Sequence, residues 1–526
     1  MKVAIRGGRI ARIMAGAMLT IVLVGMTTAS LFGTEVGVHV FTSGPLIVFW
    51  DPSEGISDEK VVFNNVYETL LRYDPATDTF DPILAESYEA SEDHMTWTFH
   101  IRQGIKFHTG NELDAYAVKA SIDRTIEGER GAYYIWNAVD RIDVTDKYTV
   151  VFHLKYPAPL DLSAAGTWCA WIFDPTVADR DWFYDGNEAG TGPYVIEGGN
   201  GDTEVVISRF EDYWGGWEGD HFDTVVFKVI EEESTRLQMM KAGQIDFLWT
   251  VSPDQIADLE ADDDVEVVVS PAWLQLIACY NNAKTSEHPI SNVAVRKALS
   301  HSIPYADILE GVFAGYARQP RGIVPYGLWG WSEDVFQYTT DLDAARDLLV
   351  EAGYPGGGFS LLVTHCSGDE IERRTAELWK AELAKIGVDL QIRTMPWDSQ
   401  VALSHAADPN DRQDIFIQYM IPSYAHPHSF LQEQFQTLDP PGFNWSYYAN
   451  PVFDDLILQA EVAAGTSRSE GAALYVDAQN ILQEDAAGIG IADMMSMQPI
   501  SADIGGFEQA NPAYPDCVFW YELYRK

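Results

Sequence analysis

One stretch, residues 81–125, constrains the fold of this chain more than any other. Its segment TWTFHI at 96–101 alternates apolar and polar residues, which is typical of a strand with one buried face. Asp114 then precedes apolar residues spaced three and four apart, and this pattern predicts a helix with an acidic N-cap that ends near Glu127. With a short strand expected over 105–108, the stretch predicts strand, turn, strand and helix.

The loop inside this stretch, Gly104 to Gly110, holds a lysine and a histidine between two glycines, a composition that suits a phosphate site. A phosphate cradle, however, places its Gly-rich loop directly before a helix N-terminus. Here Asn-Glu-Leu separates the second glycine from the helix. A hairpin whose glycines adopt positive φ angles is therefore favoured.

Four segments of the stretch carry a resemblance to a known family. They are LAES at 84–87, WTFHIR at 97–102, KFHTG at 106–110 and the predicted helix at 115–124. Together they closely resemble the signature of bacterial extracellular solute-binding family 5, which comprises the peptide-, nickel- and, in some branches, oligosaccharide-binding receptors of ABC importers. The segment GTGPY at 190–194 is similar to the turn by which that family returns to its first lobe.

The resemblance implies a fold as well. We expect an α/β protein of the two-lobed periplasmic-binding-protein class with an extra subdomain, in which mixed sheets are flanked by helices and a hinge joins the lobes. The expected divisions are 36–83, 189–274 and 498–526 for lobe I, 84–188 for the inserted subdomain, and 275–497 for lobe II.

The length and composition agree with several lobes. A chain of 526 residues that is 47% hydrophobic can bury a large core, and its length predicts three or four domains or lobes. Strand patterns at 359–364 and 388–394 enclose a helical pattern at 370–386, which predicts a βαβ unit.

The chain is strongly acidic, with a net charge of −45 from 79 acidic and 34 basic residues. Such a surface repels phosphate backbones and anionic headgroups, so no nucleic-acid partner and no electrostatic membrane adhesion are expected. A saline habitat and an ordinary acidic secreted protein both fit this charge.

The first thirty residues carry basic, apolar and small-residue regions in that order, which predicts a secretory signal peptide over 1–30. The mature chain is then periplasmic or otherwise extracytoplasmic. An uncleaved anchor over 13–32 is the alternative, because that segment is just long enough to span a bilayer.

No metal or cofactor is predicted. The four cysteines, at 169, 279, 366 and 517, lack any C-x-x-C spacing, so both disulfides and buried free thiols stay open. The pair His426 and His428 has no nearby acidic or cysteine partner that would complete a metal site.

No catalytic motif supports an enzyme. The chain contains no H-E-x-x-H helix, no G-x-S-x-G turn, no Walker loop and no dinucleotide fingerprint. Carboxylates are abundant, but on a chain of this charge most lie on the surface and no pair can be nominated. We therefore expect a binding protein, with a secreted hydrolase as the rival class.

The resemblance places the ligand between the lobes, against the region around Trp397 and the loop at 422–431. Wide, water-containing clefts of this kind combine aromatic walls with a few oriented polar groups. The candidate ligand-binding residues are Trp397, Ser423, Tyr424, His426, Trp445 and Tyr447.

In peptide-binding members this loop carries an aspartate that holds the peptide's ammonium group. The matching position here is Ser423, and His426 stands where an acidic residue often precedes Pro427. A desolvated ammonium without a carboxylate would be unfavourable by roughly several kcal/mol. This departure argues against a standard free-amine peptide and leaves room for a blocked peptide or a neutral oligosaccharide.

The expected function is that of the substrate-binding component of an ABC importer. It would capture an oligopeptide-like solute by lobe closure and deliver it to the permease subunits, acting as a monomer. An oligosaccharide-binding receptor of the same family is the alternative.

Overall fold

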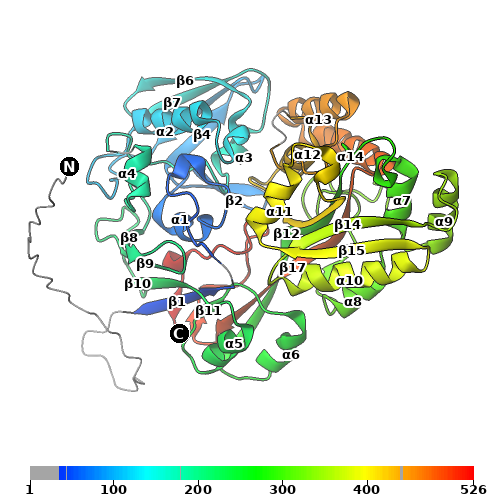
Figure 1. Ribbon diagram of the computed structural model, residues 1–526. Helices are drawn as coiled ribbons and strands as arrows, with labels where there is room; N and C mark the ends of the chain where they lie inside the picture. The colour runs from blue at the N-terminus through cyan, green and yellow to red at the C-terminus, as the bar shows by residue number, and fades with distance from the viewer. Residues whose placement is uncertain (1–34, 43, 178, 439–441) are drawn as a thin grey trace, which may run out of the picture. The chain divides into compact units, whose positions relative to one another are not determined.

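The computed structural model describes residues 35–42, 44–177, 179–438 and 442–526 (Figure 1). The predicted signal peptide and the alternative anchor lie outside these residues. Residues 35–526 form one compact unit. Within the described ranges, no helix is both long and apolar enough to cross a membrane.

A mixed sheet of eleven strands runs through the described chain. Ten strands form its main path, and a further short strand pairs with β17 at one side. In spatial order the path is β15 (Val388–Met395), β14 (Phe359–Cys366), β16 (Ile415–Met420), β12 (Val265–Tyr280), β17 (Gly488–Ser501), β11 (Phe247–Leu248), β1 (Val36–Phe41), β10 (Thr224–Val229), β9 (Glu204–Arg209) and β8 (Tyr194–Gly199), with β13 (Ala317–Arg318) beside it.

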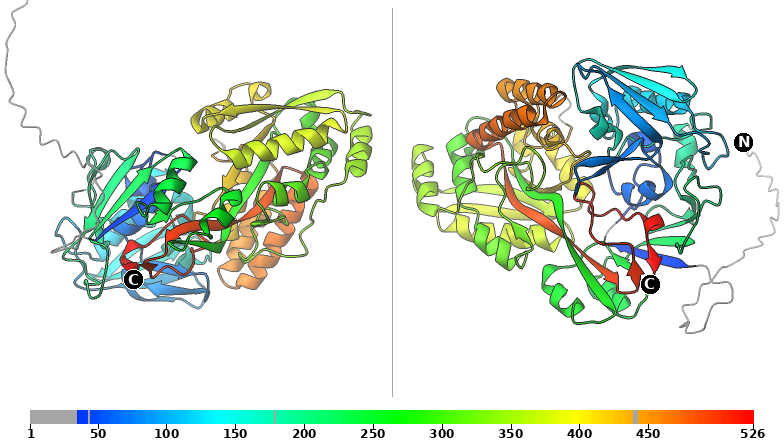
Figure 2. Two further views of the ribbon diagram at one scale, coloured as in Figure 1. Left: turned by 90° about the horizontal axis from the view of Figure 1, so that it is seen from below. Right: turned by 180° about the vertical axis from the view of Figure 1, so that it is seen from behind.

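The two longest strands, β12 and β17, are antiparallel and join the two halves of this sheet. Their register runs from Val265 opposite Ser501 to Cys279 opposite Gly488, and it shifts between Pro271 and Gln275. Figure 2 shows the two strands side by side, in green and red. The sequence patterns at 265–269 and 274–280 predict two extended segments, and both belong to one strand with an interrupted ladder.

The predicted βαβ unit is confirmed. Strands β14 and β15 are parallel, and α10 (Glu370–Ala384) connects them and packs on both. Asp369 caps α10 by accepting a hydrogen bond from the Glu372 amide at 2.7 Å. The buried Trp379 and Leu383 turn one face of the helix toward the sheet.

The opening stretch of the sequence analysis forms most of a smaller antiparallel sheet. Its strand order is β4 (Ala85–Ala90), β5 (Thr96–Ile101), β7 (Thr149–Leu154) and β6 (Val139–Asp146). Strand β5 buries every second side chain, as predicted, and α2 (Ala115–Gly128) is capped by Asp114, which accepts from the Ala117 amide at 3.0 Å.

The predicted short strand at 105–108 is wrong, since only a single bridge joins Lys106 to Glu112. The loop instead docks onto the segment at 190–193. His108 contacts Glu188 through Nδ1 at 2.7 Å and the carbonyl of Gly192 through Nε2 at 2.8 Å. The lysine and the histidine of the loop thus have structural roles. Gly104 and Gly110 have positive φ angles, as predicted.

The remaining helices cover the sheets and connect their strands. They are α1 (Lys60–Val66), α3 (Leu160–Ala164), α4 (Arg180–Tyr184), α5 (Glu233–Lys241), α6 (Ile256–Leu259), α7 (Val293–His301), α8 (Tyr305–Gly311), α9 (Leu342–Glu351), α11 (Trp397–Ser404), α12 (Pro427–Phe435), α13 (Pro451–Ala464) and α14 (Arg468–Asp485).

Two predicted elements are wrong in extent. The apolar spacing at 61–71 predicts a helix over those residues, but α1 ends at Val66 and Leu71 already belongs to β2 (Leu71–Asp74), which pairs with β3 (Thr79–Pro82). The family resemblance implies a final strand over 515–524, but only β19 (Tyr524–Arg525) forms there, and it pairs with β18 (Ile504–Gly505). Ahead of β19 the C-terminal segment is held instead by a buried ion pair, in which Lys60 lies 2.7 Å from Asp516.

The four cysteines are free, and three of them are buried. The predicted alternative of buried thiols therefore applies to Cys169, Cys279 and Cys517, while Cys366 is only partly covered. Burial raises the pKa of the Cys279 thiol to about 12, which keeps it protonated.

His39, on β1, gives a testable dependence of stability on pH. Its ring is fully buried among Phe41, Phe247 and Trp520, neither ring nitrogen has a hydrogen-bond partner, and burial lowers its pKa from 6.5 to about 3. Below pH 6.5 the unfolded chain binds a proton that the folded chain excludes. The stabilising contribution is therefore complete above pH 6.5 and is lost as the pH falls toward 3.

We expect His39→Phe to gain stability relative to the unmodified protein by about 1.4 kcal/mol for each pH unit below 6. Urea unfolding of both proteins between pH 7 and pH 4 measures this difference. A difference that stays constant across that range would contradict the assignment.

Candidate solute-binding site

The loop between β16 and α12 places Ser423 in a cluster of hydroxyl groups. The Ser423 amide donates to the hydroxyl of Ser429 at 2.9 Å, and Ser429 lies in the first turn of α12. Pro427 begins that helix after His426, whose ring nitrogen caps it by accepting from the His428 amide. The local sequence thus fixes the loop through a proline-initiated, side-chain-capped helix.

Glu433, one turn further along α12, is the centre of this cluster. Its Oε1 accepts hydrogen bonds from Ser429 at 2.5 Å and from Ser423 at 3.1 Å. The phenol of Tyr134 also donates to Oε1 and lies 2.5 Å from the Ser423 hydroxyl. Three hydroxyl groups therefore surround one oxygen of a single carboxylate.

Tyr134 comes from a different part of the chain. It lies in a short 3-10 helix, Tyr133–Trp136, beside the small antiparallel sheet, and is 299 residues from Glu433 in sequence. Thr167, from the same region, donates its amide to the Ser423 carbonyl at 2.9 Å. These contacts join the loop after β16 to the region of the small sheet.

Burial raises the pKa of Glu433 to about 7, although the three hydroxyl donors oppose this effect. The desolvation of the carboxylate outweighs the stabilisation by neutral donors. Among the described residues, no lysine, arginine or histidine forms an ion pair with Glu433. The group therefore titrates close to neutral pH.

A small recess of about 30 Å³, partly open to solvent, shares Thr167 with this cluster. Its lining comes from three separate segments, within residues 64–72, 165–167 and the C-terminal residues Tyr514 and Phe519, together with Ile83. Thr167 belongs to both features, because its amide donates to the Ser423 carbonyl and the residue lines the recess. Its hydroxyl is fully enclosed and has no hydrogen-bond partner.

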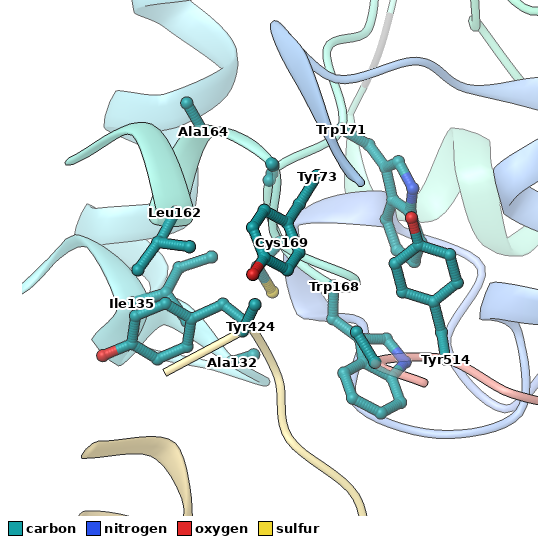
Figure 3. Packing of buried hydrophobic residues seen from close by; sticks show 14 of the residues in the cluster. Tyr73, Ala132, Ile135, Leu162, Ala164, Trp168, Cys169, Trp171, Tyr424 and Tyr514 are labelled. Atoms are coloured by element: carbon teal, nitrogen blue, oxygen red, sulfur yellow. The ribbon is translucent and has the colours of Figure 1, made fainter. Parts of the chain in front are cut away.

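Tyr424 and His426 are buried rather than exposed to a cleft. In Figure 3 the ring of Tyr424 enters the same packed cluster as Ala132, Ile135 and Leu162. His426 has no exposed surface and packs against Trp329, Tyr424 and Tyr475. Burial lowers the pKa of His426 well below its usual range, so the imidazole is neutral.

Three aromatic residues, Trp397, Phe416 and Trp445, form what we call the aromatic platform. Phe416 and Trp445 stack with ring centroids 4.4 Å apart, and Trp397 packs edge-on at 5.8 Å and 5.3 Å from them. Phe416 and Trp445 are buried, whereas Trp397 is 41% exposed. The platform therefore offers one open indole supported by a rigid base.

Tyr447 is held apart from these rings. Its hydroxyl donates to the Ser404 carbonyl at 2.8 Å, and the Arg412 guanidinium lies 3.8 Å from its ring centroid. The six predicted site residues thus fall into separate groups. Trp397 and Trp445 share the platform, Ser423 belongs to the hydroxyl cluster, Tyr424 and His426 pack together in the interior, and Tyr447 stacks with Arg412.

The described residues contain no group of three or more His, Cys, Asp or Glu side chains that could hold a metal ion. His428 and Glu461 approach to 3.4 Å, which is a pairwise contact. What the arrangement offers is recognition through an open indole, a partly covered carboxylate and a buried hydroxyl.

The strand order places this chain among two-lobed binding proteins, and solved structures agree. A dipeptide-binding protein from Pseudoalteromonas sp. SM9913, solved with Met-Leu, is 22% identical and covers 94% of this chain and 100% of its own, with a TM-score of 0.81. The predicted two-lobed periplasmic-binding-protein fold is confirmed.

The chain belongs to the bacterial extracellular solute-binding proteins, family 5, whose middle-region profile matches residues 79–440. A curated relative, the glutathione-binding protein GsiB of Escherichia coli O1:K1 / APEC, is 26% identical over 503 residues, which cover 94% of this chain and 95% of GsiB. The ABC transporter-associated periplasmic binding protein DppA of Helicobacter pylori, solved with the peptide STSA, is 25% identical with a TM-score of 0.80, covering 94% of this chain and 98% of DppA.

Sequence reasoning did not find Glu433, Tyr134, Thr167 or Phe416. No local pattern marks them, since a glutamate on a helix and a tyrosine in a loop are ordinary surface residues in most proteins. Glu433 follows Ser429 at the helical spacing of four, which would have linked these two residues but not Tyr134.

We expect Tyr134→Phe to lower the free energy of unfolding by about 1–2 kcal/mol, because a hydrogen bond to the Glu433 carboxyl is lost. Its neighbour Tyr133→Phe is the matched control, since no hydrogen bond of the Tyr133 hydroxyl is found among the described residues. Urea titration measures both variants. Equal stability of the two would show that the contact between Tyr134 and Glu433 contributes nothing.

Proposed function

We propose that this chain is the extracytoplasmic substrate-binding component of an ABC importer, which captures an oligopeptide-like solute and delivers it to the membrane permease. The observation that carries the proposal is the likeness, over 94% of the chain, to a receptor solved with a bound peptide. Membership of an extracellular solute-binding family supports it. The mature protein acts as a monomer after export through its predicted signal peptide.

Solute capture occurs by closure of two lobes about a hinge. We place the hinge in β12 between Pro271 and Gln275, where the pairing with β17 shifts. A break in the ladder lets the strands bend without loss of the pairs on either side. The break coincides with the lobe boundary predicted at 274/275.

The predicted residues Trp397, Ser423, Tyr424, His426, Trp445 and Tyr447 contribute to solute binding in two ways. Trp397 provides an open surface for direct stacking, and Ser423 lies in the hydroxyl cluster beside the recess. The buried Tyr424, His426 and Trp445 hold these groups in position. The protein returns its solute unchanged, which distinguishes a receptor from a hydrolase.

A thermal-shift screen of di- to pentapeptides, glutathione and oligosaccharides tests the class of solute. We expect peptides to raise the midpoint of unfolding, since a ligand that binds only the folded state stabilises it. Chromatography of each bound compound after incubation should recover it intact. Stabilisation by oligosaccharides alone, or hydrolysis of the bound peptide, would overturn the proposal.

Trp397→Ala should weaken binding of the best peptide from that screen about tenfold, because an indole that stacks on a ligand typically contributes of order 1–2 kcal/mol. Isothermal titration calorimetry measures the affinity. Tyr116→Ala is the matched control, since Tyr116 is an exposed aromatic residue on α2, outside the predicted site. Unchanged affinity in Trp397→Ala would exclude the platform from the site.

A further inference from the structure

Glu433 differs from the ion-paired acids of this protein in how its charge is balanced. Asp516 pairs with Lys60 at 2.7 Å, Asp414 pairs with Lys284 at 3.0 Å, and Glu54 pairs with two arginines. Glu433 forms no ion pair with any described residue. A partly buried carboxylate without a cation is unfavourable unless a proton or an external cation neutralises it.

Buried acids without a cation can be stabilised by hydrogen bonds alone, as Glu68 and Glu59 are in this protein. Glu68 receives donors on both oxygens, from Tyr213 on Oε1 and from Thr191 and Trp214 on Oε2. Glu59 accepts two backbone amides, those of Ile56 and Ser57. These carboxylates have structural roles that account for their burial.

The donors around Glu433 also act on one oxygen, as those of Glu59 do, but Oε2 of Glu59 is fully enclosed whereas Oε2 of Glu433 is not. Tyr134, Ser423 and Ser429 donate to Oε1, and within the described chain nothing donates to Oε2. Oε2 is also absent from the fully enclosed unpartnered atoms, so it retains accessible surface on a half-buried side chain. The hydroxyl groups fix the carboxylate and leave its second oxygen free to bind.

The neighbouring Thr167 independently indicates a ligand at this place. Thr167 is only 2% exposed and lines the recess, and its amide donates to the Ser423 carbonyl. Its hydroxyl is enclosed and has no hydrogen-bond partner. Buried hydroxyls normally find a partner. Thr167 has a free hydroxyl, Glu433 has a free carboxylate oxygen, and both residues bind Ser423. This pair of groups suits a ligand that carries adjacent polar and cationic groups.

We propose that Oε2 of Glu433 binds the ammonium group of the solute, and that Tyr134, Ser423 and Ser429 position this carboxylate. The inference rests on the proposed function as a receptor for a peptide-like solute. It assigns the carboxylate to α12 rather than to the loop position occupied by Ser423. A free-amine peptide, which the serine alone would disfavour, then has its counter-charge within the same cluster.

The ionisation of Glu433 fits this role. Burial raises its pKa to about 7 without ligand, and an ammonium group within hydrogen-bond distance would favour the ionised form. Binding thus replaces the proton of the carboxyl by the cation of the solute. A charge-assisted hydrogen bond of this kind is shorter and stronger than one between neutral groups.

Glu433→Gln tests the inference, because glutamine keeps an oxygen for the three hydroxyl donors and removes only the charge. The probes are trialanine and Met-Leu, each with its N-acetyl form, and calorimetry measures their affinities. We expect the variant to bind the two free-amine peptides about 10- to 100-fold more weakly. The N-acetyl forms should bind weakly and equally to both proteins.

The matched control is Glu59→Gln, since burial raises the pKa of Glu59 to about 7 as well and both carboxyls lack a cation. This variant should bind all four probes like the unmodified protein. Circular dichroism verifies folding. If Glu433→Gln does not fold, Glu433→Asp is used in its place. Because this variant keeps the charge on a shorter side chain, it should retain part of the preference for free amines.

The two proposals fail in different ways. If Glu433→Gln binds trialanine and Met-Leu as tightly as the unmodified protein does, the assignment of Glu433 is wrong and the receptor function stands. If the unmodified protein prefers the N-acetyl forms, the assignment is also wrong. If it binds none of the four peptides, the peptide-receptor function fails and this inference fails with it.

Discussion

The antiparallel pairing of β12 with β17 is the interaction on which the rest of the structure depends. These strands are the only long ladder between the part of the sheet that contains β14, β15 and β16 and the part that contains β1, β9 and β10, as far as the described chain shows. A regular ladder would hold both parts rigidly, because each pair fixes the next. The ladder is irregular at two places, between Pro271 and Gln275 and between Leu276 and Ile277.

Buried charges hold the segments that the sheet does not pair. The C-terminal segment has little strand structure, yet Lys60 and Asp516 fix it against α1 with both side chains 3% exposed. Asp414, directly before β16, and Lys284, shortly after β12, similarly join the segments next to these two strands. Removing one partner from such a pair leaves an uncompensated buried charge, so these contacts specify position strongly.

The carboxylate of Glu433 differs from these ion pairs in how its charge is balanced. Several buried acids are matched by a cation, as Asp516 is by Lys60, whereas Glu433 receives three hydroxyl donors on Oε1 and pairs with no cation among the described residues. The serine at 423, which looks like the loss of a charged group when the loop is considered alone, becomes one of three hydroxyls that hold a carboxylate from the next helix. A carboxylate for recognition can thus come from a different position in the fold.

The sequence by itself determined the elements whose signals are local. The alternation in β5, the cap of α2 by Asp114 and the strand-helix-strand pattern at 359–394 all depend on neighbours within a few residues. Predictions failed where a distant partner decided the outcome, as in the C-terminal segment, where Asp516 pairs with Lys60 and only the short β19 forms. Only the tertiary structure decided that Tyr134 meets Glu433 across 299 residues and that Trp397 alone of its platform stays open. The physical reason is that the periodicity of helices and strands depends on residues that are close in sequence. Burial and charge balance depend instead on contacts between segments that no local pattern connects.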